Sequence, residues 1–245
     1  MLILGLDFET TGFNIPTIGV TEIGMVMWDT DLHAPLKLFG CVVDPGPSAI
    51  WEPGVEKVHG LTQAICDKHG MAEDKALRYV LSWYGEADVA CAHNGTAYDR
   101  PLLDTWAARH GWDSQPSKVW IDTMTDVEIP GKSSRLTYMA ADHEFLNPFP
   151  HRAVFDVMTM LKILDKNDLG KVLELAASPT LEVKAIVSFE QKDLARNLGY
   201  HAQYSTNLDG TRGRFKHWTA SVKACKLEKA REDAKAAGFS IEVIG

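Results

Sequence analysis

The stretch that decides the fold is LILGLDFETTG, residues 2–12 of the chain. Its continuous apolar run, rich in Leu and Ile, is typical of a central β-strand that is buried on both faces. Two carboxylates, Asp7 and Glu9, lie near the end of this strand and leave the same face of it, because strand side chains alternate. Acids on an apolar strand are costly to bury unless cations pair with them, whereas two solvated acids at a strand end would fit the same pattern.

Further strand-like and helical segments follow this strand. Strand character recurs over residues 22–29, 37–43, 87–92 and 118–122. Apolar residues at helical spacing, with capping and stop residues, recur over residues 62–69, 72–84, 99–110, 136–143 and 155–164. Strands come first, and helices alternate with strands from the middle of the chain. This order predicts an α/β domain in which helices flank a mixed five-stranded sheet.

A second, smaller unit is predicted near the C-terminus. The sequence Ser178-Pro179-Thr180 follows a polar helix and marks a boundary between a main domain, residues 1–175, and a small α/β module, residues 185–245. The module is expected to be a βαβαβ unit with strands 184–189, 214–222 and 239–244, helices 191–198 and 226–237, and a polar turn over 205–213. A unit of about 60 residues buries little core, so we expect it to dock on the main domain.

Composition excludes several classes of protein. Of the 245 residues, 45% are hydrophobic and 24% are charged, which is ordinary for a globular protein. No stretch approaches the roughly 20 apolar residues that span a bilayer, and the apolar start lacks the basic flank of a signal peptide. We therefore expect a cytoplasmic protein with no membrane partner, and its four cysteines, none in a CxxC pair, are expected to be reduced and mostly buried.

The net charge of −8 argues against a nucleic-acid partner, but the charge is unevenly distributed. From Glu182 to the end there are 11 Lys or Arg and 8 Asp or Glu, a net +3, which leaves −11 for residues 1–181. An acidic body still handles a polyanion when its carboxylates bind divalent cations. The basic tail would add attraction to phosphate, or it is simply a solvated helix face.

Two later segments carry further candidate residues. In AHNGTAYDRPLL, residues 92–103, a strand ends in a turn and Asp99 opens a helix, where an Asp often serves only as a cap. In HRAVFD, residues 151–156, a Pro-rich loop leads into a helix, so that Asp156 stands on the helix and His151 projects from the loop. This arrangement suits a rigid metal ligand beside a mobile acid–base group, although a His near a helix start is usually structural.

Taken together and in this order, DFETTG, AHNGTAYDRPLL and HRAVFD resemble the DEDDh exonucleases of the DnaQ-like, ribonuclease H-related superfamily. The resemblance covers about residues 1–170, and the segments VHGLT (58–62) and IDT (121–123) resemble two further parts of that family. It implies a ribonuclease H-like fold. It also implies a 3′→5′ exonuclease that releases nucleoside 5′-monophosphates from the free 3′ end of a nucleic acid.

The resemblance further implies the roles of five residues. Asp7, Glu9, Asp99 and Asp156 would bind two Mg²⁺ or Mn²⁺ ions, the hard cations that carboxylate oxygens suit. The ions would lie about 4 Å apart on either side of the scissile phosphate, one generating the attacking hydroxide and the other stabilising the leaving 3′ oxygen. His151 would be the general base, because an imidazole exchanges protons near neutral pH.

Six residues match positions that, by the same resemblance, contact or shape the site of the terminal nucleotide: Phe8, Thr10, Thr11, His59, Leu61 and Asn94. The backbone N–H of Thr10 would bond the 3′ hydroxyl. His59 and Leu61 would pack on the terminal sugar or base, and Asn94 would help to shape the pocket.

The expected partner is a nucleic acid with a free 3′ end, DNA in preference to RNA. Two other functions stay open, namely a proofreading or processing subunit that acts mainly within a polymerase or replication complex, and a phosphodiesterase of very short oligonucleotides. A homodimer or a replication-protein partner also stays open. The C-terminal segment resembles, more loosely, the extensions of phage-type DnaQ-like exonucleases. It forms either a strand-holding surface or a docked, stabilising module, and the residues of interest there are Arg212, Arg214, Lys216 and Trp218.

Overall fold

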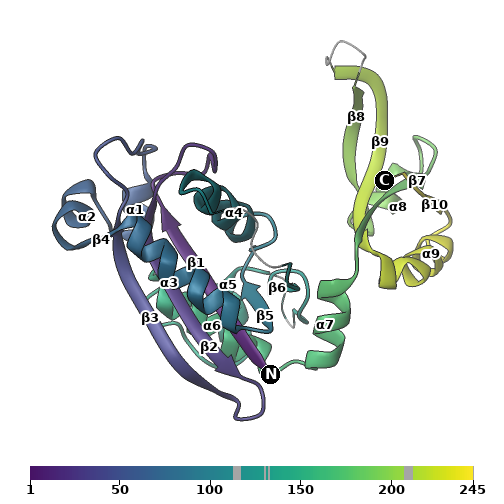
Figure 1. Cartoon of the computed structure of the whole chain (residues 1–245). Helices are drawn as coiled ribbons and strands as arrows, with labels where there is room; N and C mark the ends of the chain where they lie inside the picture. Colours follow the sequence, from purple (N-terminus) through teal and green to yellow (C-terminus); the bar gives the residue numbers. More distant parts are fainter. Residues whose placement is uncertain (113–116, 130, 132, 207–211, 245) are drawn as a thin grey trace. The chain divides into compact units, whose positions relative to one another are not determined.

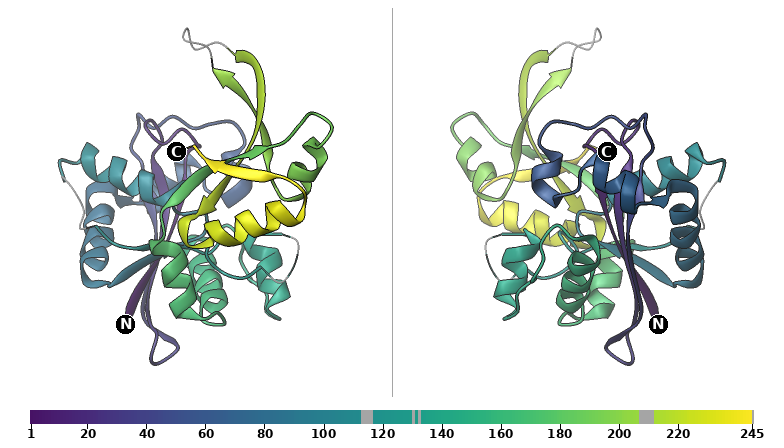
Figure 2. Two further views of the ribbon diagram at one scale, coloured as in Figure 1. Left: turned by 90° about the vertical axis from the view of Figure 1, so that its right-hand side faces the viewer. Right: turned by 90° about the vertical axis from the view of Figure 1, so that its left-hand side faces the viewer.

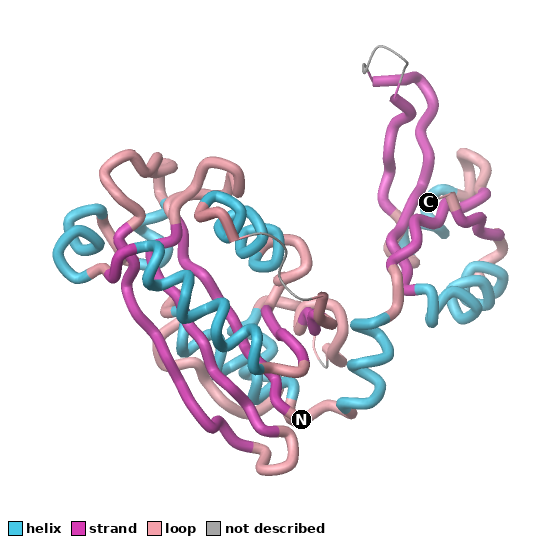
Figure 3. The backbone as a smooth tube through the Cα atoms, viewed as in Figure 1, coloured by secondary structure: helices cyan, strands magenta, loops and turns pink. Residues whose placement is uncertain are grey.

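The computed structural model describes residues 1–112, 117–129, 131, 133–206 and 212–244. These residues form two compact units, Met1–Ala176 and Ala177–Gly245. The N-terminal unit is built on a six-stranded sheet and the C-terminal unit on a four-stranded sheet (Figures 1 and 3). Among the described residues, no helix combines the length and the apolar character that crossing a membrane requires.

The sheet of the N-terminal unit has the strand order β4-β3-β2-β1-β5-β6. Its strands are β1 (Leu2–Thr10), β2 (Val20–Asp29), β3 (Ala34–Asp44), β4 (Met71–Ala72), β5 (Val89–Ala92) and β6 (Trp120–Asp122). The first three strands are antiparallel, while β5 runs parallel to β1, β6 parallel to β5 and β4 parallel to β3. The predicted mixed sheet is confirmed. The sequence pattern does not predict β4, because a two-residue strand carries no periodicity.

Helices cover both faces of this sheet (Figure 2). The helices of this unit are α1 (Val55–His59), α2 (Gln63–His69), α3 (Glu73–Glu86), α4 (Asp99–Arg109), α5 (Leu136–Asp142), α6 (Ala153–Leu164) and α7 (Leu169–Ala177), of which α3 to α7 contribute to the two cores. Leu4 and Phe8 of β1 pack with α3 and α4 in one core, while Ile3 packs with α5 and α6 in the other. Because Asp7 and Glu9 alternate with Phe8, they lie on the face that α6 covers.

Glycines let α6 lie directly on the sheet. A Cβ atom on Gly5 of β1 would stand 2.6 Å from Val157 Cγ1, and one on Gly24 of β2 would stand 2.2 Å from the carbonyl carbon of Ala153. Gly24 therefore faces helix backbone, which has less freedom to move than the end of a side chain. The close approach places the first turn of α6, which carries Asp156, against the strands.

We expect Gly24→Ala to lower the free energy of unfolding by about 1–3 kcal/mol, the usual cost of overpacking a close contact. The melting temperature should fall by about 2–4 °C for each kcal/mol in a chain of this size. Gly85→Ala is the matched control, because nothing lies within 4 Å of the added methyl group and helix α3 favours alanine. Thermal unfolding of both variants tests this, and equal melting temperatures would show that α6 does not depend on the close approach.

The C-terminal unit pairs its strands in the order β10-β7-β9-β8, all antiparallel. Its elements are β7 (Thr180–Ile186), α8 (Lys192–Asn197), β8 (His201–Thr206), β9 (Arg212–Lys223), the 3-10 helix η1 (Ala224–Lys226), α9 (Leu227–Ala236) and β10 (Ser240–Val243). The sequence pattern does not predict β8, because residues 201–204 are all exposed and only pairing with β9 holds them as a strand.

Trp218 belongs to the small core of this unit and is 8% exposed. The predicted strand-holding role of its neighbours concerns side chains that lie outside the part the structure describes, namely those of Arg212, Arg214 and Lys216. That role stays a prediction.

Candidate active site

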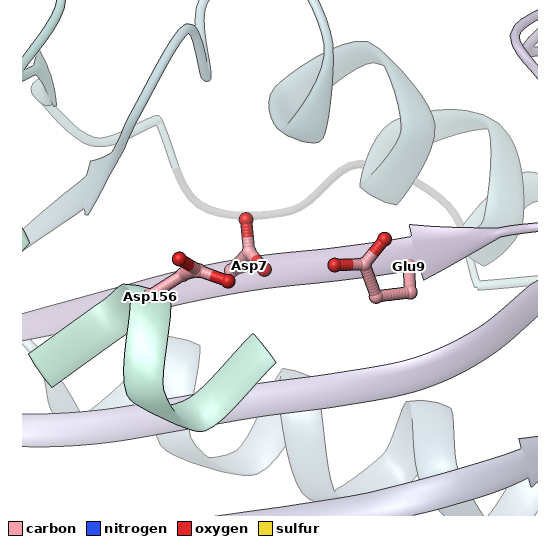
Figure 4. Close-up of side chains that lie close together, drawn as sticks. All are labelled: Asp7, Glu9 and Asp156. Carbon is pink, nitrogen blue, oxygen red and sulfur yellow. The ribbon is translucent and has the colours of Figure 1, made fainter. Parts of the chain in front are cut away.

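Three carboxylates from two distant segments of the chain converge on one face of the sheet. Asp7 and Glu9 stand on β1 and Asp156 stands on the first turn of α6, and the three side chains gather over the strand (Figure 4). Each of them offers an oxygen atom, and these atoms all lie within 4.8 Å of one another. A donor set made only of carboxylate oxygens fits a hard divalent cation such as Mg²⁺ or Mn²⁺.

Asp99 lies next to this group but is not one of the three. It begins α4, is only 3% exposed, and its carboxylate accepts a hydrogen bond from the backbone N–H of Phe8. Its Oδ1 atom is buried and has no hydrogen-bond partner among the described residues. A buried carboxylate oxygen without a donor is costly, so this atom fits a site that holds a cation.

Burial raises the pKa values of all four acids. The pKa of Glu9 rises to about 8, with the negative charge of Asp156 as the second cause. Burial also raises the pKa of Asp99 to about 7 and that of Asp156 to about 6. The pKa of Asp7 rises well above its usual value, through burial first and then through the charge of Asp99. Such a cluster is costly in a folded protein unless cations bind among the carboxylates, because a divalent ion reverses the local field.

These pKa shifts predict how stability depends on pH when divalent cations are chelated. Because the folded protein binds these protons more tightly than the unfolded chain does, the stabilisation is full below the unfolded pKa values near 4. It is lost as pH rises through the folded pKa values of about 6, 7 and 8 at Asp156, Asp99 and Glu9. We therefore expect the melting temperature in EDTA to fall between pH 5 and pH 8. Added Mn²⁺ should reverse much of the fall at pH 8, because it binds only the folded state.

Calorimetry of the wild type and Asp7→Asn isolates the contribution of the cluster. The variant removes one negative charge, so its melting temperature in EDTA should fall less between pH 5 and pH 8, and Mn²⁺ should raise it less. Parallel curves for the two proteins would contradict this explanation of the pKa shifts.

His151 lies at the same site, in the loop that precedes α6. Its side chain is exposed, and its φ of 61° lies in the left-handed region that residues other than glycine seldom adopt. The backbone N–H of His151 donates to the Asp156 carboxylate, and a positive charge on its imidazole opposes the increase that burial causes in the pKa of Asp156. An acid–base group therefore stands beside a candidate metal ligand.

Asn147 orients Asp156 and was not among the residues that the sequence pattern indicated. Its side-chain amide donates to Asp156 Oδ1 at 2.7 Å. Its own Oδ1 accepts the backbone N–H of Phe149 at 3.0 Å, which fixes the loop that carries it. An Asn in a Pro-rich loop is usually a turn residue, so no local signal distinguishes this one.

A cavity of about 750 Å³ opens in front of the acids, which is within the size range of small-molecule sites. Its lining includes the four acids, His151, and four of the six residues predicted to contact or shape the nucleotide site: Phe8, Thr10, His59 and Asn94. The other two, Thr11 and Leu61, are 0% and 2% exposed and stand behind the lining. Thr11 Oγ1 accepts the backbone N–H of Gly19 at 3.0 Å, so its side chain supports the loop after β1.

Hydrogen bonds fix His59 against the end of β1. The backbone N–H of Leu61 donates to His59 Nδ1 at 3.1 Å, so Nδ1 is unprotonated and Nε2 donates to the carbonyl of Thr10 at 3.2 Å. Burial lowers the pKa of His59, in agreement with a neutral ring. Tyr98 is a second residue that contacts the end of β1. Its hydroxyl donates to the carbonyl of Gly12 at 2.8 Å and lies 2.6 Å from Thr10 Oγ1.

Asp122 holds the turn that leads to Asp99. It is 1% exposed, and its carboxylate accepts the backbone N–H groups of Asn94 at 2.8 Å and Thr96 at 3.2 Å. It also accepts the hydroxyl of Thr96 at 2.7 Å. Asn94 has a φ of 63°, and these bonds stabilise that left-handed conformation. The turn between β5 and α4 is therefore rigid, which places Asp99 beside the other acids.

Comparison with known proteins gives one family match. A family model named RNase T and described as "Exonuclease" matches residues 4–164. No curated protein sequence matches the chain.

Solved structures are similar at low sequence identity. Escherichia coli exonuclease I in complex with a dA16 oligonucleotide has a TM-score of 0.65 and 12% identity, over 98% of this chain and 68% of that one. A zinc-bound form of the E. coli exonuclease I complex with single-stranded DNA has a TM-score of 0.65 and 13% identity, over the same shares. The nuclease domain of 3′hExo, a DEDDh family member bound to rAMP, has a TM-score of 0.57 and 19% identity, over 67% of this chain and 90% of that one. These likenesses confirm the predicted ribonuclease H-like fold.

Proposed function

The chain belongs to the exonuclease family that this model describes, the DnaQ-like 3′→5′ exonucleases, and we propose that it removes nucleotides one at a time from the 3′ end of DNA with the help of two divalent cations. The family match confirms the predicted class of enzyme, a hydrolase of phosphodiester bonds. The observation that carries the finer proposal is the convergence of Asp7, Glu9 and Asp156 at the cavity that also contains His151.

The acids are the groups that would hold the cations. Asp7, Glu9 and Asp156 offer oxygens within 4.8 Å of one another, and Asp99 offers a buried oxygen without a donor. When bound, the cations would supply Lewis-acid stabilisation of the charge that develops on the scissile phosphate and on the leaving 3′ oxygen. Hydrogen bonds from Asn147 and from the backbone of His151 orient Asp156, so little reorganisation is needed for it to act as a ligand.

In this proposal His151 takes a proton from the water that attacks the phosphate. Its exposed side chain lines the cavity and stands beside Asp156 on the loop before α6. A free imidazole nitrogen accepts a proton near neutral pH, which suits a general base. The product would be a nucleoside 5′-monophosphate, because the bond that breaks is the one to the 3′ oxygen of the penultimate nucleotide.

The cavity volume and lining support a terminal nucleotide as its occupant. Its lining includes two aromatic residues, Phe8 and His59, and two polar ones, Thr10 and Asn94. We favour DNA over RNA because the two likenesses to exonuclease I, each over 98% of this chain, are to complexes with DNA, whereas the likeness to the rAMP-bound domain covers 67% of this chain.

A substrate panel tests the proposal. DNA and RNA strands with a 5′ label, of 2 to 20 nucleotides, would be incubated with Mg²⁺, Mn²⁺ or EDTA, and the product lengths would be read on a gel. We expect a ladder that shortens from the 3′ end, release of 5′-monophosphates, faster digestion of DNA than of RNA, and no digestion in EDTA. A closed single-stranded DNA circle is the matched control and should stay intact. Cutting of the circle, or digestion in EDTA, would contradict the proposal.

A further inference from the structure

A fifth acid, Glu22, is buried beside the four acids of the site. It stands on β2 directly opposite Glu9 of β1 in the antiparallel register, so both side chains leave the same face of the sheet. Glu22 is 3% exposed, and its Oε2 atom has no hydrogen-bond partner among the described residues. Its negative charge contributes to the raised pKa of Glu9, after burial and the charge of Asp156, and it contributes least among the causes that raise the pKa of Asp7. Burying this carboxylate among other acids is costly, so the residue that pairs with it indicates why it is there.

The partner of Glu22 is Arg152. Two nitrogens of the Arg152 guanidinium, Nε at 3.2 Å and Nη2 at 2.8 Å, donate to Glu22 Oε1. Arg152 is the N-cap residue of α6, and it lies between His151 and the first helical residue, Ala153. The pair therefore joins β2 to the point where the loop becomes the helix. Two hydrogen bonds from one planar guanidinium fix orientation as well as distance.

This attachment bears directly on His151. The φ of 61° at His151 is costly for a residue with a side chain, so surrounding contacts must hold the backbone in that conformation. On the C-terminal side, the next residue is tied to β2 by Glu22, and Gly24 two residues along β2 is in close contact with Ala153. The position of the imidazole relative to the acids thus depends on a strand that is distant in sequence.

Two other roles for Glu22 are less consistent with the geometry. As a further cation ligand it would have to reach the cavity in front of the acids, but the cavity lining includes Asp7, Glu9, Asp99 and Asp156 and does not include Glu22. As a simple counter-charge for Arg152 it would not need to be buried, because the Arg152 side chain is 42% exposed and solvent would stabilise its charge.

We propose that Glu22 is a positioning residue for His151, and that its two-nitrogen pairing with Arg152 holds the loop before α6 so that the imidazole reaches the attacking water. This inference rests on the proposed exonuclease function, because it concerns the rate of that reaction. It predicts that Glu22 affects the rate only while His151 is present.

A double-mutant cycle tests the inference. Single-turnover rates and KM on a 3′-terminated oligonucleotide would be measured for the wild type, Glu22→Gln, His151→Ala and the double variant. We expect Glu22→Gln to lower the rate by about 10–100-fold, the range that a small misplacement of a catalytic group costs, with KM and the Mn²⁺ concentration for half activation within about two-fold of the wild type. In the His151→Ala background the same substitution should change the rate by less than about two-fold.

Two further variants separate positioning from charge balance and from folding. Arg152→Lys keeps the charge but loses the planar fork, and we expect it to lower the rate as Glu22→Gln does. Glu73→Gln is the matched control. Glu73, at the start of α3, pairs with Arg109 of α4 at 3.6 Å and lies outside the cavity lining. We expect it to leave the rate unchanged. Thermal unfolding would show that each variant is folded at the assay temperature.

The outcomes are distinguishable. A wild type that does not digest the oligonucleotide would contradict the proposed function itself. An active wild type with an unchanged rate in Glu22→Gln, or with the full loss repeated in the His151→Ala background, would overturn the positioning role while leaving the exonuclease function intact. A full rate in Arg152→Lys would also overturn it, because a charge alone would then suffice.

Discussion

Asp7→Asn is expected to lower kcat by at least about 10³-fold, because losing one ligand removes several kcal/mol of cation-dependent stabilisation of the transition state. The substitution keeps the size of the side chain and removes one negative charge from four acids that repel one another. The raised pKa of Asp7, caused by burial and then by Asp99, indicates that the carboxylate destabilises the fold in the absence of cations. The variant should therefore lose activity without losing stability, which separates a functional residue from a structural one.

The measurement is the rate of digestion of a 5′-labelled oligonucleotide with a free 3′ end, together with thermal unfolding in EDTA. Asp104→Asn is the matched control, because Asp104 is an exposed acid on α4, the helix that Asp99 begins. It should digest the substrate at the wild-type rate. An Asp7→Asn protein that remains as active as Asp104→Asn would exclude Asp7 as a cation ligand.

His151→Ala is expected to lower kcat by about 10²–10⁴-fold at neutral pH, the usual contribution of general base catalysis. The residue lines the cavity beside Asp156 and is exposed, so its loss should leave the fold and the cation site largely unchanged. Raising the pH should recover part of the rate, because more of the attacking water is then deprotonated without the help of the imidazole.

The pH–rate profile of His151→Ala and of a control histidine variant would check this. His69→Ala is suitable, because His69 is an exposed residue at the end of α2, outside the cavity lining. The control should follow the wild-type profile. A His151→Ala enzyme with the wild-type rate at neutral pH would remove His151 from the proton transfer.

The sequence by itself determined the central strand and the class of enzyme. A continuous apolar run over residues 2–8 is stable only when both faces of the strand are buried, and strand alternation then places Asp7 and Glu9 on one face. The ordered motifs around Asp99 and Asp156 identified the family. Each motif is a turn or a loop followed by a helix that carries an acid, and such a pattern is visible in a short stretch of sequence. The model match to residues 4–164 confirmed that family.

Other features were decided by contacts that only the tertiary structure makes. Asn147 reaches Asp156 through the folding of a Pro-rich loop, and Glu22 reaches Arg152 across 130 positions of the chain. Thr11 and Leu61 match the family pattern, yet packing places them behind the cavity lining. Periodicity and capping describe interactions between near neighbours in the sequence. A hydrogen bond between a strand and a distant helix start depends instead on how closely the helix can approach the sheet, which is a property of the whole packed core.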